Sequence, residues 1–352
     1  MKFFDKKTAQ ALLTALAFAF ALLFVYAAWR VLLAFLFAIF FAYLLEAPVG
    51  RLQGWLHGSR GAAIAVVYLI FAAGLALVVF LAGPPVVQEA QTLMRQAPQW
   101  VQSGGELARQ VASQHGWSES AIERAQSFLT QHRADILSAT QTLVLGAART
   151  LQEVWWLFLV PIVAIFFLKD GRKLGQTLID SVENPRNRQI VASTMHQMNS
   201  MLGDFLRAQL LLSAMAMVVI TGVLSLMRVP YALALGPAAG ALEFIPVVGP
   251  VIAGLLVIAV AFLAGYHHLL IVLIFLLVWR GIQDYVSSPR ILGDKLMLHP
   301  LAVLFGVLAG GEVGGVIGIF LSIPVLATLR ILWHTWSLYR RDKQPAPLPR
   351  LP

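Results

Sequence analysis

The sequence has no cysteine and few charged residues. Without cysteine the chain can form no disulfide, no thiolate metal site and no thiol nucleophile. Only 12% of its 352 residues are charged, about half the ~25% typical of a soluble domain, whereas 59% are hydrophobic. This balance excludes a soluble enzyme, a disordered chain and a fibrous repeat.

The sequence contains long runs of apolar residues. Several of them reach or approach the roughly 18–20 residues that a helix needs to cross a bilayer. The first follows Lys2, Lys6 and Lys7, as in a signal peptide, but it extends from Ala9 to Trp29 and is therefore interpreted as a retained helix. We predict an all-α polytopic membrane protein with about eight hydrophobic segments and additional amphipathic helices outside the membrane.

The net charge of +9 comes from 26 Lys and Arg against 17 Asp and Glu. No basic stripe with interleaved aromatic residues is present, so we expect no nucleic-acid partner, and the partner implied by the apolar runs is membrane lipid. The positive residues gather beside the apolar runs, as the positive-inside tendency requires. Their placement predicts that both termini are cytoplasmic and that the near-neutral stretch 86–142 lies outside.

Composition divides the chain into six predicted segments. These are three membrane helices (1–85), extracytoplasmic amphipathic helices (86–142), a fourth membrane helix (143–168), a cytoplasmic amphipathic segment (169–204), a core with two helical hairpins (205–334) and a cytoplasmic basic, proline-rich tail (335–352). The second, third and fourth helices are expected to end at Pro48, at Gly83-Pro84-Pro85 and at Lys169-Asp170-Gly171. A further break is expected near Gly116.

The two predicted hairpins are pairs of short apolar pieces around a proline- or glycine-rich break. The first pairs 231–244 with 251–266, and the second pairs 300–309 with 316–333. Their tips contain Pro246, Gly249, Pro250, Gly310, Gly311 and Gly314. Re-entrant hairpins and ordinary thin spans both fit the charge distribution. The two units could form an inverted repeat, with chance similarity of glycine-rich segments as the alternative.

Each predicted tip carries one carboxylate, Glu243 or Glu312. Charge at membrane depth is costly and therefore informative, and a low dielectric favours the neutral form of a carboxyl unless it has a partner. Such a group can take a proton or bind a cation. Alternatively, each glutamate caps a short helix or pairs with an arginine.

A second polar set lies on one predicted helix, where Arg280, Gln283, Asp284 and Ser287 share a face. Arg280 and Asp284 are spaced to pair, and the stripe suits a hydrated pathway. The alternative is that this part of the helix projects into the cytoplasm. Two further cations complete the candidate pathway residues, Arg207 and Arg290. For Arg207 and its neighbours Asp204 and Gln209, an interfacial position is the preferred interpretation.

Enzyme and metal motifs are absent from the sequence. There is no zinc-protease H-E-x-x-H and no P-loop. Gly203-Asp204 and Gly293-Asp294 resemble the G-x-G-D of intramembrane aspartyl proteases, but Met201 and Ile291 replace the first glycine. We expect no enzyme activity, no cofactor and no metal site, and we interpret His267-His268 as interfacial.

Several motifs resemble the autoinducer-2 exporter family of bacterial membrane proteins. They are Phe166–Gly171, Val229–Leu233, Leu242–Pro250, Gln283…Pro289-Arg290-Ile291…Gly293 and His299-Pro300-Leu301 with the Gly-Gly tip that follows. The order and spacing of these motifs resemble those of the family from about residue 10 to residue 335. The family has acidic or amide residues at the position of Asp284.

The resemblance implies a multi-pass inner-membrane transporter that forms a homo-oligomer, with a pentamer as one form. Family members have been linked to export of the quorum-sensing signal autoinducer-2, and others to Na⁺/H⁺ antiport. The leading hypothesis is therefore an alternating-access exporter of a small polar metabolite, with cargo between the two hairpin tips. Monovalent cation/proton antiport is the rival, and a non-transporting scaffold acting through Val86–Thr142 is a third hypothesis.

Overall fold

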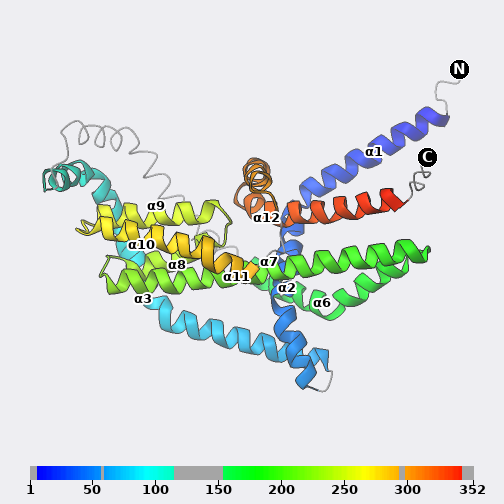
Figure 1. Ribbon diagram of the computed structural model, residues 1–352, viewed down its shortest axis with the longest axis horizontal. Coiled ribbons are helices and arrows are strands. Elements are labelled where there is room, and N and C mark those ends of the chain that lie inside the picture. The colour runs from blue at the N-terminus through cyan, green and yellow to red at the C-terminus, as the bar shows by residue number, and fades with distance from the viewer. Residues whose placement is uncertain (1–5, 57–58, 115–153, 293–297, 343–352) are drawn as a thin grey trace, which may run out of the picture. The chain divides into compact units, whose positions relative to one another are not determined.

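The computed structural model describes residues 6–56, 59–114, 154–292 and 298–342 (Figure 1). Helices and the turns between them account for these ranges, which contain no strand. Five of the described helices are long and apolar enough to cross a bilayer, and there are three shorter apolar helices (Leu12–Ala27, Ala232–Glu243 and Val248–Leu263). The prediction of an all-α polytopic membrane protein is confirmed.

The chain forms two compact units. The first contains Met1–Tyr68 and Thr150–Thr177, and the second contains Leu69–Arg149 and Leu178–Pro352. Four described helices contribute to the first unit: α1 (Lys6–Ala27), α2 (Trp29–Trp55), the start of α3 (Arg60–Gln114) and most of α6 (Val154–Asp180). Small and branched side chains of α2, α3 and α6 form its core, among them Ala38, Ala63 and Ala164.

A carboxylate joins the three core helices of the first unit. Glu46 of α2 accepts hydrogen bonds from Arg60 of α3 at 2.8 Å and from Arg172 of α6 at 2.7 Å. Arg60 also donates to the backbone oxygen of Leu168 at 2.7 Å. Because Arg60 is only 17% exposed, this network holds a charge that would otherwise be costly to bury.

Three expected helix ends are wrong. Pro48 lies inside α2, the Gly83-Pro84-Pro85 sequence lies inside α3, and α6 continues through Lys169-Asp170-Gly171 to Asp180. A proline removes one backbone donor, but its φ is compatible with a helix, so a long apolar helix bends there more readily than it ends. The expected break near Gly116, and the fourth membrane helix before residue 154, lie outside the described residues.

The second unit is organised around α7 (Pro185–Leu226). The side chain of Asn184 caps the start of α7 by accepting hydrogen bonds from the amides of Arg186 and Asn187. Residues 185–204 of the predicted amphipathic segment and the apolar residues that follow them form one continuous helix rather than two elements. It ends before Arg228, whose φ of 55° stops helical propagation.

The first hairpin consists of α8 (Ala232–Glu243) and α9 (Val248–Leu263). The break between them covers residues 244–247 and includes Val247 at a φ of 66°, whereas Gly249 and Pro250 lie in the first turn of α9. The 12 residues of α8 span only about 18 Å, less than the ~30 Å hydrocarbon core. This length favours the re-entrant interpretation.

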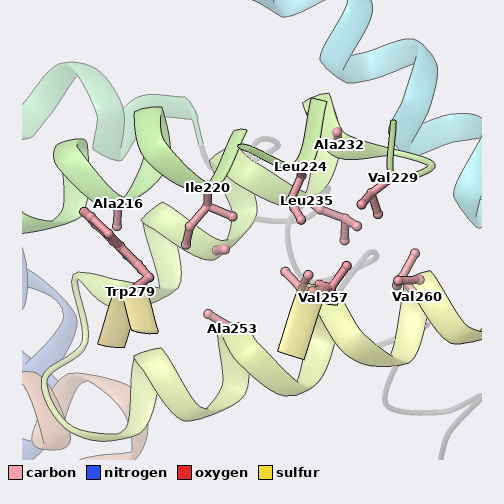
Figure 2. Close-up of a cluster of buried hydrophobic side chains, with 13 residues drawn as sticks. Ala216, Ile220, Leu224, Val229, Ala232, Leu235, Ala253, Val257, Val260 and Trp279 are labelled. Carbon is pink, nitrogen blue, oxygen red and sulfur yellow. The ribbon is translucent and has the colours of Figure 1, made fainter. Parts of the chain in front are cut away.

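Helices α7, α8 and α9 pack closely, and α10 (Leu269–Ile282) packs on α9 (Figure 1). Gly236 and Gly240 let α8 approach α7, since a Cβ at either glycine would overlap the backbone of Thr221 or Met217. Figure 2 shows the buried cluster between these helices, with the Trp279 indole of α10 extending toward Ala216 of α7.

The end of α10 leads into a π-helical turn, η1 (Gln283–Ser287), and then into α11 (Ser288–Leu292). The second hairpin is formed within α12 (Pro300–Asp342), which reverses at Gly315, where φ is 56° and ψ is −140°. Gly310 and Gly318 of its two arms lie against each other, leaving no room for a Cβ on either. Both predicted helix reversals are therefore present, and their relation as an inverted repeat stays a prediction.

Candidate functional site

The tip of the first hairpin holds a buried carboxyl group. Glu243 is the last residue of α8 and is 7% exposed. The Nε2 of Gln283, from the π-turn, donates a 2.6 Å hydrogen bond to its Oε2. No Lys or Arg among the described residues forms an ion pair with Glu243. The carboxyl therefore has a neutral partner in an apolar setting, the situation in which its charge is most costly.

Polar side chains of α7 complete the end of α8. The last four carbonyls of a helix have no intrahelical partner. Here Gln209 Nε2 donates to the backbone carbonyl oxygen of Glu243 at 2.7 Å, and Ser213 Oγ donates to the backbone carbonyl oxygen of Gly240 at 2.5 Å. The amides of Phe244 and Ile245 serve the two carbonyls between them. All four end carbonyls are thus satisfied, which stabilises a helix that stops inside the apolar region.

The π-turn places Gln283 inward. Helical π-turns are rare and frequently occur at functional sites. Gln283 is 3% exposed, and its Oε1 has no hydrogen-bond partner among the described residues. The same is true of the Nε1 of Trp279, one turn earlier. Near the Glu243 carboxyl there are therefore one buried acceptor, on Gln283, and one buried donor, on Trp279, that make no hydrogen bond within the described residues.

The predicted polar face of this helix is divided. Arg280 and Asp284 form the expected ion pair at 2.7 Å, with both side chains about two-fifths exposed. Gln283 is instead buried against the hairpin. The helix thus presents a charged pair on an accessible side and an amide to Glu243.

The remaining candidates lie elsewhere. Glu312 precedes the turn of the second hairpin, is exposed, and makes no hydrogen bond or ion pair with another described residue. Arg290 is exposed on α11. Arg207 is half-buried on α7 and pairs with Asp204 at 2.7 Å. The structure brings together Glu243 and Gln283, with the Arg280–Asp284 pair on the same helix as Gln283. It does not bring Glu312 into this group.

The tips differ in their surroundings. At the first tip, Pro246 and Gly249 are buried, and a Cβ at Gly249 would overlap the Leu242 carbonyl oxygen. At the second, Gly314 has no neighbour within 4 Å of a Cβ position. Among the residues with described positions, no group of three His, Cys, Asp or Glu side chains could hold a metal ion.

Sequence reasoning did not identify Gln209, Ser213 and Trp279 as part of this site. The available signal was the spacing of Gln209 and Ser213, polar residues four apart on an otherwise apolar helix, which places both on one face. Gln209 is buried. Trp279 gave no distinguishing signal because aromatic residues are common in apolar helices.

A polytopic helical protein with a buried carboxyl beside broken helices has the architecture of a membrane transporter. The family model described as AI-2E family transporter matches residues 13–338. The chain therefore belongs to the AI-2E transporter family, and its role is in membrane transport. The family points away from an enzyme.

Relatives named as transport proteins or as a permease match most of the chain. The candidate transport protein YrrI of Bacillus subtilis (strain 168) is 26% identical over 84% of this chain and 83% of its own length. The candidate transport protein MT0215 of Mycobacterium tuberculosis (strain CDC 1551 / Oshkosh) is 29% identical over 83% and 79%. The candidate permease PerM of Escherichia coli (strain K12) is 25% identical over 95% and 94%.

Proposed function

We propose that this protein is a secondary transporter of the bacterial inner membrane that exports a small polar metabolite, such as autoinducer-2, by alternating access coupled to an ion. Membership of the AI-2E family supports both the transport role and the choice of cargo. The proposed coupling group is Glu243, and Glu312 is the second candidate.

The observation that carries the proposal is the burial of Glu243 with only the Gln283 amide as a side-chain partner. A protonated carboxyl fits this position at little cost, whereas a charged one favours a state in which the hairpin tip meets water. Loss or gain of a proton therefore changes the relative free energy of the two hairpin positions. Such a differential interaction is what couples a bound ion to a conformational change.

Contacts within the second unit support the predicted sidedness. Tyr231, at the start of the first hairpin, donates to Gln96 of α3 at 2.6 Å, and Gln96 lies in the segment predicted to be outside. Thr194 and Thr335, 3.2 Å apart, both belong to segments predicted to be cytoplasmic. The Tyr266 hydroxyl bonds the Met227 oxygen at 2.8 Å, so α9 returns to the end of α7 from which α8 started.

The test uses everted membrane vesicles, in which export appears as uptake of labelled autoinducer-2. We expect energised uptake with the unaltered protein and its loss in Glu243→Gln. Glu183→Gln, a change at an exposed turn residue, is the matched control and should transport normally. The same assay on Glu312→Gln tests the second tip. Normal uptake by well-folded Glu243→Gln would remove that residue from the mechanism.

Monovalent cation/proton antiport is the second candidate. It is favoured by the unpartnered Oε1 of Gln283 beside the carboxyl, because hard cations prefer oxygen ligands. A pH-gradient dye in the same vesicles, with sodium, potassium and lithium added in turn, distinguishes the two. Cation-dependent collapse of the pH gradient that is lost in Glu243→Gln would establish antiport. No response to any of the cations would favour metabolite export instead. A scaffold acting through residues 86–142 predicts that activity survives mutation of both tips but not deletion of that region.

A further inference from the structure

A second polar site lies in the same unit, between α7 and α12. It is an open pocket of about 460 Å³, within the range of small-molecule sites. Its polar lining consists of His196, Gln197, Ser200, Asp204, Arg330 and His334. None of the pocket's lining residues belongs to the Glu243 site.

Two contacts mark the ends of the pocket along the helices. Thr194 meets Thr335 at 3.2 Å on one side of it, and the rings of Phe205 and Phe320 lie 6.3 Å apart on the other. The lower-numbered residue of α7 meets the higher-numbered residue of α12, so the two helices run antiparallel along the pocket. Its lining residues fall between these contacts in both helices.

The lining provides both hydrogen-bond donors and acceptors. The Asp204 carboxylate is paired with Arg207 at 2.7 Å, and the Arg330 guanidinium also lines the pocket. Arg donates only, a carboxylate accepts only, and Ser, Gln and His do both. Closely spaced donors and acceptors match a ligand with several hydroxyl groups.

Three aromatic rings lie between the pocket and Glu243. Phe320 approaches Phe205 at the pocket's end and stacks on Phe244 with centroids 5.0 Å apart and planes 18° apart. Phe244 directly follows Glu243 in the chain. Phe320 therefore bridges the end of the pocket and the tip of the first hairpin, and the residue is 5% exposed.

We propose that this pocket is the loading site for a small hydroxylated cargo and that the Phe320 ring closes the route from it to Glu243. The inference rests on the proposed function, because it takes the cargo to move from the pocket toward the hairpin tip. It adds a binding site, a ligand class and a gate to that function. On the predicted topology the pocket opens to the cytoplasm, where an exporter collects its cargo.

The binding test exploits a chain with no native cysteine. Ser200→Cys places a thiol in the exposed pocket lining, and Ser193→Cys places one on an exposed position of α7 outside it. Everted vesicles present the cytoplasmic face to a membrane-impermeant thiol reagent. Autoinducer-2 at about ten times its dissociation constant should slow labelling of Ser200→Cys about tenfold, by mass action, and leave Ser193→Cys unchanged. Adding Arg330→Gln should raise the concentration needed for protection by about tenfold to a hundredfold.

The gate is tested in proteoliposomes by flux of labelled autoinducer-2 down its own gradient with no other driving force. Phe320→Ala should raise this uncoupled flux severalfold, because it removes the ring between Phe205 and Phe244. Phe305→Ala, on an exposed position of the same helix, is the control and should not leak. If Phe320→Ala does not fold, Phe320→Leu provides a smaller opening with the same expected direction. An unchanged flux in the folded variant would overturn the gate.

The outcomes separate this inference from the proposed function. Glu243-dependent autoinducer-2 transport without protection of Ser200→Cys would overturn the pocket and leave the proposed function standing. Protection together with normal transport by Glu243→Gln would support the pocket and overturn the coupling role. Absence of both transport and protection would overturn both.

Discussion

Gln209→Leu should loosen the first hairpin by removing one hydrogen bond. The substitution keeps a similar volume but leaves the Glu243 backbone carbonyl without the donor that now lies at 2.7 Å. Leaving one buried polar group unsatisfied costs about 1–3 kcal/mol. Because Gln209 and Glu243 are both buried, we expect most of that cost to appear as easier opening of the hairpin tip.

The assay is hydrogen exchange of the purified protein, read by mass spectrometry over residues 232–247. A loss of about 1–3 kcal/mol corresponds to about 5- to 150-fold faster exchange through local opening. Gln189→Leu, an exposed glutamine on the same helix, is the matched control and should leave exchange in the hairpin unchanged. Equal exchange rates in the two variants would refute the reasoning that Gln209 holds the end of α8.

Three further predictions concern packing and charge. Gly240→Ala should lower the thermal stability of the purified protein, at a cost of about 1–3 kcal/mol, because its Cβ would overlap the Met217 backbone; Gly254→Ala has open space and should be neutral or stabilising. Glu46→Gln should lower the free energy of unfolding by about 1–3 kcal/mol, because it weakens the hydrogen bonds to Arg60 and Arg172. Asp170→Asn, which loses only a 4.0 Å ion pair with the exposed Lys173, should lower it by less than about 0.5 kcal/mol. Equal melting temperatures of the two variants would contradict this ranking. Glu89→Gln should speed exchange at the start of α8 less than Glu89→Leu does, since the amide oxygen of Gln can still accept from the Ala234 amide, now 3.0 Å from the carboxylate.

The hairpins were predictable because the residues at their breaks themselves oppose helix formation. Pro246 and the glycines around residue 315 oppose helix continuation at the places where the chain turns, and Arg228-Val229-Pro230 marks the end of α7. The same logic failed at Pro48 and at Gly83-Pro84-Pro85, where the helices continue. A single proline lowers helix stability without dictating a turn, and the outcome depends on packing that the local sequence does not contain.

The candidate site was predictable in part. Glu243 was identified because burying a lone carboxylate at a helix break in an apolar region costs free energy, and this pattern can be recognised from the sequence alone. Its partners were not, because the contacts of Gln283 and Gln209 join residues 40 and 34 positions away in the chain. The inward turn of Gln283 also depends on a π-turn, which shifts the helical register that the sequence pattern assumes.

The uninterrupted length of α7 has a mechanical consequence. Its 42 residues form a rod about 63 Å long, roughly twice the thickness of the hydrocarbon core. One part of this rod carries the end of the first hairpin through Gln209 and Ser213, and another carries α12 through Thr194 and Phe205. A tilt of a rigid rod that displaces one hairpin also displaces the other, each in proportion to its distance from the pivot. The helix would thus act as a lever, and the two hairpins would open and close in step.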